Sequence, residues 1–498
     1  MSGDSKQSSY RQVFKATSIF GGAQVFTILI GIVRSKLAAV FLGTAGVGIN
    51  GLFTSPLALI SSISSLGIPF SAVRDIAHAN EQGNAEGVAK TILAFRRWVW
   101  LTGLAGAVIT LCLSPWLSEW SFGTQDYTWG FVVLSLMVFV SAISGGQLGL
   151  LRGMRKMKEM ALASIIGGSL SLAVAVPLYW IYGTAGIVPA ILGGALATLL
   201  VSWWYSRKIF LEKVAQSWKE SFSLGSGMAK LGILITVSGM VTQLAGWGIY
   251  IFVRHVGGLE EVGLYAAGWG MTNQYVGMVF SAMGADYLPR LSGVRDNNAK
   301  IREYANQQAE ISVLILTPAM VLFMGALPLA VWILFTEDFM PIIPFVSWML
   351  AGMLLKAVSW CLGFIILAKG DSKMFLYTEV GIKFISVPAY LLGYYYCGLS
   401  GIGIAFVGIY AFYSILMFFV CRKNYEFTFS RELLTVTGIS TGILLIAFIP
   451  AIIWGFPVAY LSGATAFLLA GTYSLFELNK RMNLVALCSR VKQKFIRR

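Results

Sequence analysis

The stretch GTAGVG at residues 43–48 returns in outline as GLEEVG at residues 258–263, displaced by 215 residues. Two further matches share that offset: GTAGI at 183–187 with GLSGI at 398–402, and Arg207-Lys208 with Arg422-Lys423. Many secondary transporters use duplicated halves in a membrane to build a central site that opens to either side. The duplication therefore predicts a carrier with two related halves.

The composition indicates a membrane protein with little mass outside the lipid. Of its 498 residues, 57% are hydrophobic and 12% are charged, whereas soluble domains carry about 25% charged residues. A bilayer crossing needs roughly 20 apolar residues, and backbone groups in lipid favour helices. Fourteen spans are predicted, near 17–41, 50–73, 91–113, 127–150, 161–182, 186–206, 228–253, 262–285, 310–335, 342–368, 375–396, 401–421, 433–454 and 457–477.

The distribution of Lys and Arg predicts the orientation of these spans. With both termini placed in the cytoplasm, 33 of the 37 basic residues fall on cytoplasmic segments, as the positive-inside rule expects. Only Arg34, Lys36, Arg254 and Lys356 do not. The net charge of +15 therefore reflects topology and attraction to anionic lipids, and a nucleic-acid partner is not expected.

The expected fold is an all-α integral membrane protein of about 14 transmembrane helices. Two six-helix, pseudo-symmetric lobes are expected to surround a central cavity, with two further helices at the C-terminus. The predicted segments are an N-lobe at 1–208, a cytoplasmic linker at 209–227, a C-lobe at 228–423, spans thirteen and fourteen at 424–477, and a basic cytoplasmic tail at 478–498.

The four remaining cations are the candidate substrate-binding residues, because charged side chains within a membrane usually face a cavity or a partner. Arg34 shares a helical face with small and polar residues and is expected in the cavity. Lys36 lies about 200° round the same helix and is expected to extend toward the outer surface. Arg254 ends a stripe that includes Gln243, which indicates a cavity lining or an interfacial anchor. Lys356 lies well inside its span and is the hardest to explain as a boundary residue.

Other polar residues on the spans are weaker candidates. Amides that could bond sugar hydroxyls, or that could simply join helices, are Gln24, Asn50, Gln147, Gln243, Asn273 and Gln274. Acids near cytoplasmic ends and their basic neighbours could form local ion pairs, gates or ion-coupling sites; the acids are Asp75, Asp286 and Glu379, and the basic neighbours are Arg290 and Lys383. A cavity poor in acid and supplied with cations suits an anionic passenger, because Arg grips phosphate oxygens through paired hydrogen bonds.

Several classes of chemistry find no support in the sequence. The two histidines, His78 and His255, belong to opposite sides of the predicted membrane, and no triad, zinc spacing or phosphate-binding loop occurs. We therefore expect neither a catalytic residue, nor a metal, nor a cofactor, nor direct use of ATP.

Three segments resemble the Wzx flippases of the multidrug/oligosaccharidyl-lipid/polysaccharide (MOP) exporter superfamily. They are IVRSKLAAVFLGTAGVGING at 32–51, ADYLPRLS at 285–292, and the stretch from Leu355-Lys356 through Gly363-Phe364 and 368–370 to Thr378-Glu379. The resemblance covers roughly residues 10–425. It implies a bacterial inner-membrane protein that passes an undecaprenyl-pyrophosphate-linked oligosaccharide, such as an O-antigen repeat unit, from the cytoplasmic to the periplasmic leaflet. Arg34 and Lys356 best match the cavity cations of that family. Membrane lipids and other polysaccharide-assembly membrane proteins are the expected partners.

Three rival functions stay open from the sequence. A multidrug or cation antiporter on the same fold would be expected to carry a deep carboxylate in the first span, where this chain has Arg34 and Lys36. An integral-membrane polysaccharide polymerase or ligase would be expected to carry a large external loop, whereas every external link here is short. A non-transporting assembly scaffold is the third alternative.

Overall fold

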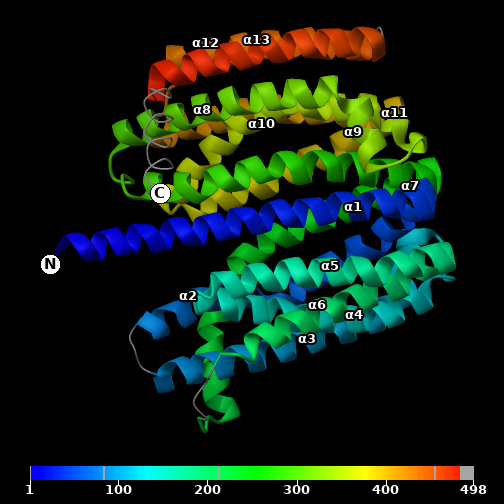
Figure 1. Cartoon of the computed structure of the whole chain (residues 1–498), viewed down its shortest axis with the longest axis vertical. Coiled ribbons are helices and arrows are strands. Elements are labelled where there is room, and N and C mark those ends of the chain that lie inside the picture. Colours follow the sequence, from blue (N-terminus) through cyan, green and yellow to red (C-terminus); the bar gives the residue numbers. More distant parts are fainter. Residues whose placement is uncertain (1, 82–84, 210–213, 454–455, 483–498) are drawn as a thin grey trace. The chain divides into compact units, whose positions relative to one another are not determined.

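The computed structural model describes residues 2–81, 85–209, 214–453 and 456–482, and this described part of the chain is helical, without β-strands. In chain order the helices are α1 (Ser2–Ser65), α2 (Ile68–Glu81), α3 (Ala85–Phe122), α4 (Thr128–Gly153), α5 (Met157–Tyr182), η1 (Gly183–Gly186), α6 (Ile187–Ser206), α7 (Trp218–Ser292), α8 (Asn298–Gly325), α9 (Leu327–Leu334), η2 (Glu337–Ile342), α10 (Ile343–Lys369), α11 (Ser372–Tyr425), α12 (Arg431–Ile453) and α13 (Phe456–Met482) (Figure 1). The predicted all-α class is confirmed. Most of the predicted basic tail lies outside the described residues.

The sequence repeat coincides with the points where long helices break. Gly43 interrupts α1 with a φ of 65°, and its repeat equivalent Gly258 interrupts α7 with a φ of 86°. Gly183 separates α5 from η1 with a φ of 54°, and its equivalent Gly398 breaks α11 with a φ of 58°. Positive φ costs a residue without a Cβ very little, so glycine is favoured at each break. The duplication is therefore present in the backbone as well as in the sequence.

The breaks reconcile the helix count with the predicted fourteen spans. Within the described residues, ten stretches are long and apolar enough to cross a membrane. Four of them contain the breaks at Gly43, Gly183, Gly258 and Gly398, and each of these four is long enough for two crossings. Ten stretches, four of them counted twice, agree with fourteen predicted spans. One predicted span, 50–73, runs across a further break, because α1 ends at Ser65 and α2 begins at Ile68.

The chain forms two compact units that divide at Gly263. Unit 1 contains the described residues up to Gly263 together with Leu334–Thr336, and unit 2 contains the rest. The first arm of α7 belongs to unit 1 because it packs there: the indole N–H of Trp247 donates to Ser121 Oγ of α3 at 3.1 Å. The units therefore divide 36 residues beyond the predicted linker at 209–227.

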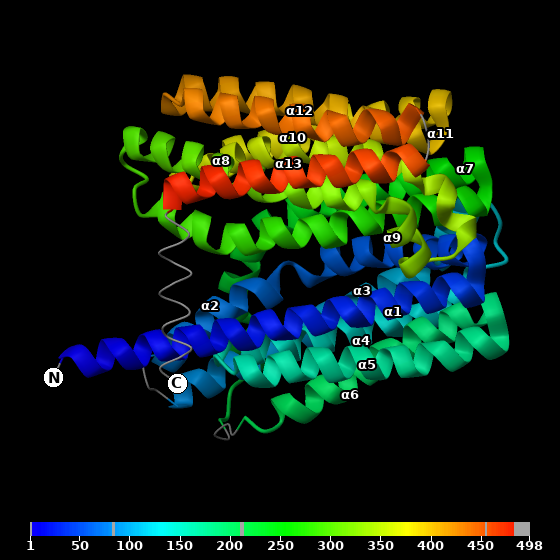
Figure 2. The same cartoon turned by 45° about the horizontal axis from the view of Figure 1, so that its top comes forward.

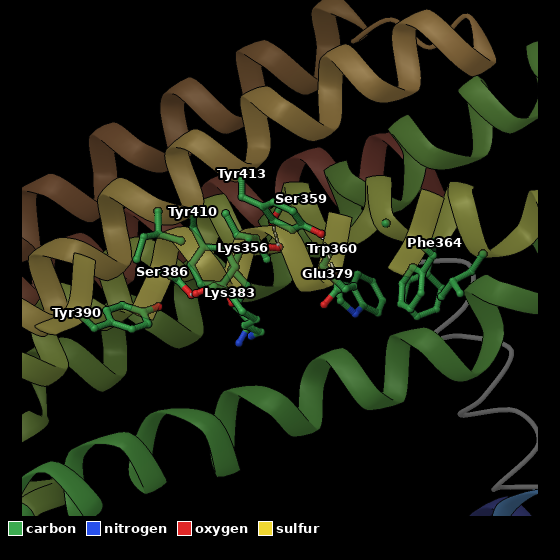
Figure 3. Close-up of a pocket in the computed structure, with 15 residues that line it drawn as sticks. Lys356, Ser359, Trp360, Phe364, Glu379, Lys383, Ser386, Tyr390, Tyr410 and Tyr413 are labelled. Carbon is green, nitrogen blue, oxygen red and sulfur yellow. Dashed lines mark hydrogen bonds between the residues drawn. The ribbon is translucent and has the colours of Figure 1, made fainter. Parts of the chain in front are cut away.

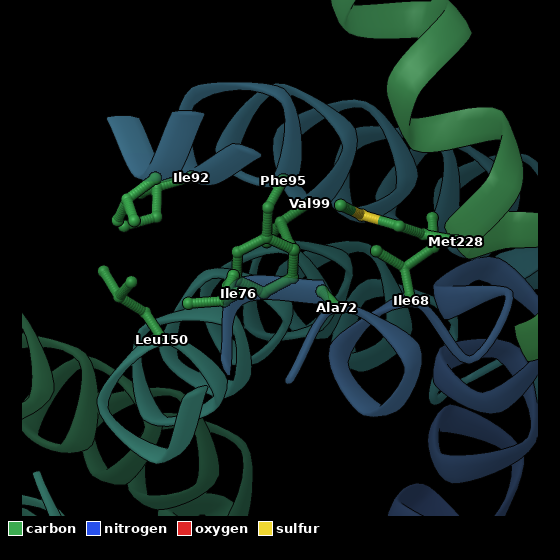
Figure 4. Close-up of a cluster of buried hydrophobic side chains, with 9 residues drawn as sticks. Ile68, Ala72, Ile76, Ile92, Phe95, Val99, Leu150 and Met228 are labelled. Atoms are coloured by element: carbon green, nitrogen blue, oxygen red, sulfur yellow. The ribbon is translucent and has the colours of Figure 1, made fainter. Parts of the chain in front are cut away.

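A cluster of buried apolar side chains holds the first part of unit 1 together (Figure 4). Buried residues of α2 and α3 pack against one another, and Leu150 of α4 and Met228 of α7 complete the cluster. The members on α2 and α3 are Ile68, Ala72, Ile76, Val88, Ile92, Phe95 and Val99. Spacings of three and four place such residues on one face of each helix. Figure 1 shows α3 to α6 side by side, and α3 contacts α4 while α6 contacts both α4 and α5.

In unit 2, the C-terminal helices α12 and α13 lie against each other and against α8 (Figure 2). A polar network fastens α13 to α8: Arg481 Nε donates to Glu310 Oε2 at 2.9 Å, and Arg481 also pairs with Glu477. Glu310 is only 7% exposed, and its other carboxylate oxygen accepts from Ser430 Oγ at 3.1 Å. An ion pair with the buried carboxylate of Glu310 thus holds α13, one of the two helices predicted to lie outside the duplication, against α8.

Candidate functional site

A cavity of about 280 Å³ lies within unit 2, between α10 and the two arms of α11 (Figure 3). The arms are residues 372–396 and 399–425, on either side of the break at Gly398. Charged, hydroxyl and aromatic side chains line this pocket, which we call the lysine pocket; they include Lys356, Ser359, Trp360, Glu379, Lys383, Ser386, Tyr390, Tyr410 and Tyr413.

Helical spacing explains why these side chains converge. On the first arm of α11, Glu379, Lys383, Ser386 and Tyr390 follow one another at intervals of four, three and four residues. Such intervals place side chains on one face of a helix. On α10 the face that carries Lys356 continues through Ser359, Gly363 and Leu367. Each helix therefore presents a polar stripe to the pocket, and Glu379 and Lys383 lie on the stripe opposite Lys356.

Lys356 is surrounded by aromatic rings. Its Nζ lies 5.5 Å from the ring centroid of Tyr410, 5.8 Å from that of Phe406 and 5.9 Å from that of Phe280. The negative faces of aromatic rings attract ammonium groups, by about 0.5–2 kcal/mol per contact depending on desolvation. This cage stabilises a charge that would otherwise be expensive at membrane depth.

One carboxylate and two ammonium groups meet in the lysine pocket. Glu379 interacts electrostatically with both Lys356 and Lys383, and the two lysines repel each other. The Tyr413 hydroxyl donates to Glu379 Oε1 at 3.0 Å, which fixes the position of the carboxylate. With one negative and two positive groups, the cluster has a surplus positive charge when both lysines are protonated.

This arrangement can bind an oxyanion that carries sugars. Ammonium groups attract phosphate oxygens, and the serine and tyrosine hydroxyls of the pocket can exchange hydrogen bonds with sugar hydroxyls. The Trp360 ring packs with Phe364 at a centroid distance of 4.5 Å and offers an apolar wall. The pocket thus combines charge, hydrogen-bonding groups and aromatic surface, as many small-molecule sites do.

Arg34 and Lys36 differ in their surroundings within unit 1. Arg34 is exposed on α1 and interacts electrostatically with the Tyr179 hydroxyl of α5. Lys36 is partly buried, and its Nζ donates to the backbone carbonyl of Phe335. The expectation that Arg34 lines a cavity and that Lys36 extends to the outer surface stays a prediction.

Arg254, on α7 in unit 1, lies beside the C-terminal end of α3. Its Nη2 donates to the carbonyl of Phe122, the last residue of α3, at 3.4 Å. The last carbonyls of a helix lack intrahelical donors, and a cation is favoured beside them. Arg254 Nε is buried and makes no hydrogen bond within the described structure. The side chain thus caps α3, and the predicted role in substrate binding stays a prediction.

The candidate amides lie in different places. Gln147 accepts a hydrogen bond from Ser202 Oγ at 2.7 Å, which joins α4 to α6. Asn273 donates to the carbonyl of Trp269 in its own helix at 3.0 Å. Gln24, Gln243 and Gln274 are exposed, and Asn50 is half-buried. The lysine pocket is lined by none of these amides.

Two of the candidate acids form local ion pairs. Asp75 pairs with the adjacent Arg74 at 2.9 Å, and Asp286 pairs with Arg290 one helical turn away at 3.6 Å. Exposed pairs of this kind contribute about 0–1 kcal/mol each. Their proposed part in gating or ion coupling stays a prediction, as does that of Glu379 and Lys383.

The tyrosines and Trp360 of the lysine pocket were not singled out from the sequence. Tyr410 and Tyr413 lie beyond the break at Gly398, so no helical periodicity connects them to Glu379. On the first arm, the spacing of Glu379, Lys383, Ser386 and Tyr390 could have indicated from the sequence that these side chains share one helical face. In the described residues, no group of three or more His, Cys, Asp or Glu is placed to hold a metal ion.

Residues 41–344 match the sequence family described as polysaccharide biosynthesis protein. The chain belongs to this family. It is 24% identical over 376 residues to the lipid III flippase of Escherichia coli (strain K12), covering 74% of this chain and 88% of that protein. It is also 24% identical over 294 residues to the stage V sporulation protein B of Bacillus subtilis (strain 168), covering 56% of this chain and 55% of that protein.

Solved structures show the same fold. An inward-facing multidrug resistance MATE family transporter of the MOP superfamily aligns with a TM-score of 0.67 at 16% identity, covering 81% of this chain and 94% of its own. The lipid II flippase MurJ, in an inward closed conformation, aligns with a TM-score of 0.64 at 13% identity, covering 92% of this chain and 99% of its own. The predicted resemblance is confirmed at the level of the polysaccharide biosynthesis protein family, and the fold is the one that a MOP superfamily transporter has. The narrower Wzx assignment stays a prediction. These relatives are named as flippases, a sporulation protein and a transporter, which agrees with the expectation of a non-enzyme.

Proposed function

We propose that this chain is a flippase for a lipid-linked oligosaccharide. The observation that carries the proposal is the lysine pocket, in which Lys356 and Lys383 lie with a single carboxylate among hydroxyl-bearing and aromatic side chains. The family, and the relative named as a lipid III flippase, support the same conclusion.

The passenger is proposed to be an undecaprenyl-pyrophosphate-linked repeat unit of a surface polysaccharide, such as O-antigen. Its pyrophosphate matches the surplus positive charge of the lysine pocket, and its sugars match the hydroxyls. Such a headgroup needs a carrier, because each hydroxyl or amide moved into hydrocarbon without a partner costs about 2–7 kcal/mol. The polyprenyl tail needs no such shelter and can remain in the bilayer.

Transport is proposed to follow alternating access, from the cytoplasmic to the periplasmic leaflet of a bacterial inner membrane. Duplicated halves that rock about a site expose it to each side in turn. In this scheme Lys356 and Lys383 contact the pyrophosphate, and Glu379 holds the two ammonium groups when no passenger is bound. Arg34, in unit 1, is proposed to contact the headgroup during transport.

The antiporter alternative rests on the fold shared with the MATE transporter. Residues 24–65 of α1 contain no Asp or Glu, so the deep carboxylate expected of a cation-coupled antiporter is missing from that helix. The sequence relatives that cover most of this chain are named as flippases. These two observations favour a lipid-linked passenger.

Reconstituted vesicles separate the candidates. The chain is placed in liposomes with a fluorescent polyprenyl-diphosphate oligosaccharide, and a membrane-impermeant quencher then reports the label in the outer leaflet. Protein-dependent movement of label between leaflets is the expected result. New glycosidic bonds would indicate the polymerase or ligase instead, and uptake of a cationic dye against a sodium or proton gradient, with the glycolipid static, would indicate the antiporter.

A further inference from the structure

A second cavity, of about 860 Å³, lies in unit 1 between α3, α4 and α6. Its wall is largely apolar, with Phe95 and Val99 on α3, Phe139 and Ile143 on α4, and Leu199 on α6. A cavity of this size is within the range of about 300–1,000 Å³ that holds a drug-sized ligand. It shares no residue with the lysine pocket.

Two arginines line this largely apolar cavity, together with the polar residues Gln147 and Ser206. The arginines are Arg96 of α3 and Arg207, which directly follows α6. The guanidinium carbon of Arg207 lies 4.7 Å from the ring centroid of Trp203 and 4.0 Å from that of Trp204, so aromatic faces hold the charge in place. Among the described residues, no carboxylate pairs with either arginine. Both guanidinium groups therefore remain able to bind an anion.

The outer wall of this cavity is made of apolar side chains that project from the protein. Trp100 is 56% exposed, Trp203 is 48% exposed and Leu200 is 61% exposed. In a membrane-spanning helix, such side chains face lipid, and Trp beside Arg is typical of the interface between hydrocarbon and headgroups. An occupant of this cavity would therefore enter from the bilayer.

We propose that this cavity binds an anionic phospholipid. The lipid phosphate lies between Arg96 and Arg207, which supply charge-assisted hydrogen bonds in fixed planar geometry. An acyl chain follows the apolar wall past Ile143 and Leu199. Basic pockets between transmembrane helices bind anionic headgroups in this way. A zwitterionic lipid could fill the apolar wall, but its own cation would repel the arginines.

Native mass spectrometry of the full chain, purified with defined lipids, tests this site. The wild-type chain is expected to retain phosphatidylglycerol in preference to phosphatidylcholine with the same acyl chains. The double variant Arg96→Gln/Arg207→Gln is expected to bind phosphatidylglycerol at least about tenfold more weakly, because each basic residue contributes about one kcal/mol or more. Soluble glycerol phosphate is not expected to displace the lipid, because it lacks the acyl chains.

The repeat offers a matched control. Arg422→Gln/Lys423→Gln removes the same net charge at the positions equivalent to Arg207 and Lys208, where Arg422 lies over the ring of Phe418. This control is expected to bind phosphatidylglycerol as the wild type does. Equal binding by the Arg96→Gln/Arg207→Gln variant, or an equal loss in the control, would overturn the proposal.

A second variant decides the matter if the double variant does not fold. Ile143→Trp leaves both arginines in place and fills the path of the acyl chain along α4. It is expected to reduce retention of phosphatidylglycerol several-fold, whereas Leu461→Trp, at a 70% exposed position of α13 in unit 2, is expected to leave it unchanged. Undiminished binding by Ile143→Trp would contradict the proposed path.

Discussion

Gly48 and Gly263 are equivalent in the repeat, 215 residues apart in sequence, and they contact each other in the fold. A Cβ on Gly48 would overlap the carbonyl oxygen of Leu259, and a Cβ on Gly263 would overlap the carbonyl oxygen of Thr44. Leu259 and Thr44 are themselves equivalent in the repeat. Equivalent residues of the two halves therefore meet where α1 crosses α7. The two helices can approach this closely because neither Gly48 nor Gly263 has a side chain.

Gly263→Ala is expected to destabilise the fold by about 1–3 kcal/mol, because the methyl group meets rigid backbone on α1. The matched control on the same helix is Gly246→Ala, where a Cβ meets nothing within 4 Å. Its expected effect is neutral to stabilising, by up to about 1 kcal/mol, since alanine is the better helix former. Thermal unfolding in detergent compares the two, and equal stability of both variants would count against the close crossing.

Arg481→Ala is expected to destabilise the docking of α13 on α8 by about 1–3 kcal/mol. The substitution leaves the buried Glu310 without its cation, although Arg481 is itself 23% exposed and solvent weakens the pair. Lys480→Ala, at an exposed neighbouring position, serves as the control and is expected to be neutral. Urea unfolding of both variants measures the difference. In the double variant Glu310→Gln/Arg481→Ala, part of the loss should be recovered, and a purely additive loss would argue against the pair.

Tyr413→Phe is expected to slow transport by about tenfold without abolishing it. The hydroxyl holds Glu379 in the lysine pocket at 3.0 Å, and a hydrogen bond to a charged group contributes about 1.5–3 kcal/mol. Tyr395→Phe, at a position on α11 that is 66% exposed, is the control and should transport normally. The vesicle assay measures both rates. A normal rate for Tyr413→Phe would show that transport does not need the hydrogen bond from Tyr413 to Glu379.

Arg34→Ala is expected to abolish export while leaving the amount of protein in the membrane normal. In unit 1 Arg34 is an exposed residue of α1, whereas Lys36, two residues on, donates to the Phe335 carbonyl. Lys36→Ala is therefore expected to lower stability more than it lowers export. Complementation of a strain that lacks this protein, with immunoblotting for abundance, distinguishes these outcomes. Full export by Arg34→Ala would remove this residue from the passenger's path.

Much of the fold was predictable because it depends on apolar runs and on an internal repeat, which can be seen in one sequence alone. The apolar runs predicted fourteen spans, and Gly43 and Gly258, which break α1 and α7, lie in links between predicted spans. The packing of the first arm of α7 was not predictable, since it depends on contacts such as Trp247 with Ser121, which join positions 126 residues apart. The division of the units at Gly263 therefore emerged only from the structure.

The candidate site was predictable only in part. Lys356 could be identified because an ammonium group within an apolar span is costly and therefore conspicuous. Its cage could not, because Phe280 and Phe406 are ordinary aromatic residues whose position depends on how α7, α10 and α11 pack. The hydrogen bond from Tyr413 to Glu379 crosses the break in α11, where periodicity carries no information.

The rate at which Lys356→Ala moves a polyprenyl-diphosphate oligosaccharide across reconstituted vesicles tests whether the lysine pocket binds the passenger. The lysine pocket needs its cations, so the expected result is a loss of at least about a hundredfold, from removal of roughly 3 kcal/mol of charge-assisted binding. Lys356→Arg should restore part of the rate, and Lys90→Ala, which removes a lysine paired with the exposed Glu86, should leave it unchanged. A wild-type rate for Lys356→Ala, in a folded and correctly inserted protein, would contradict a role of the lysine pocket in transport.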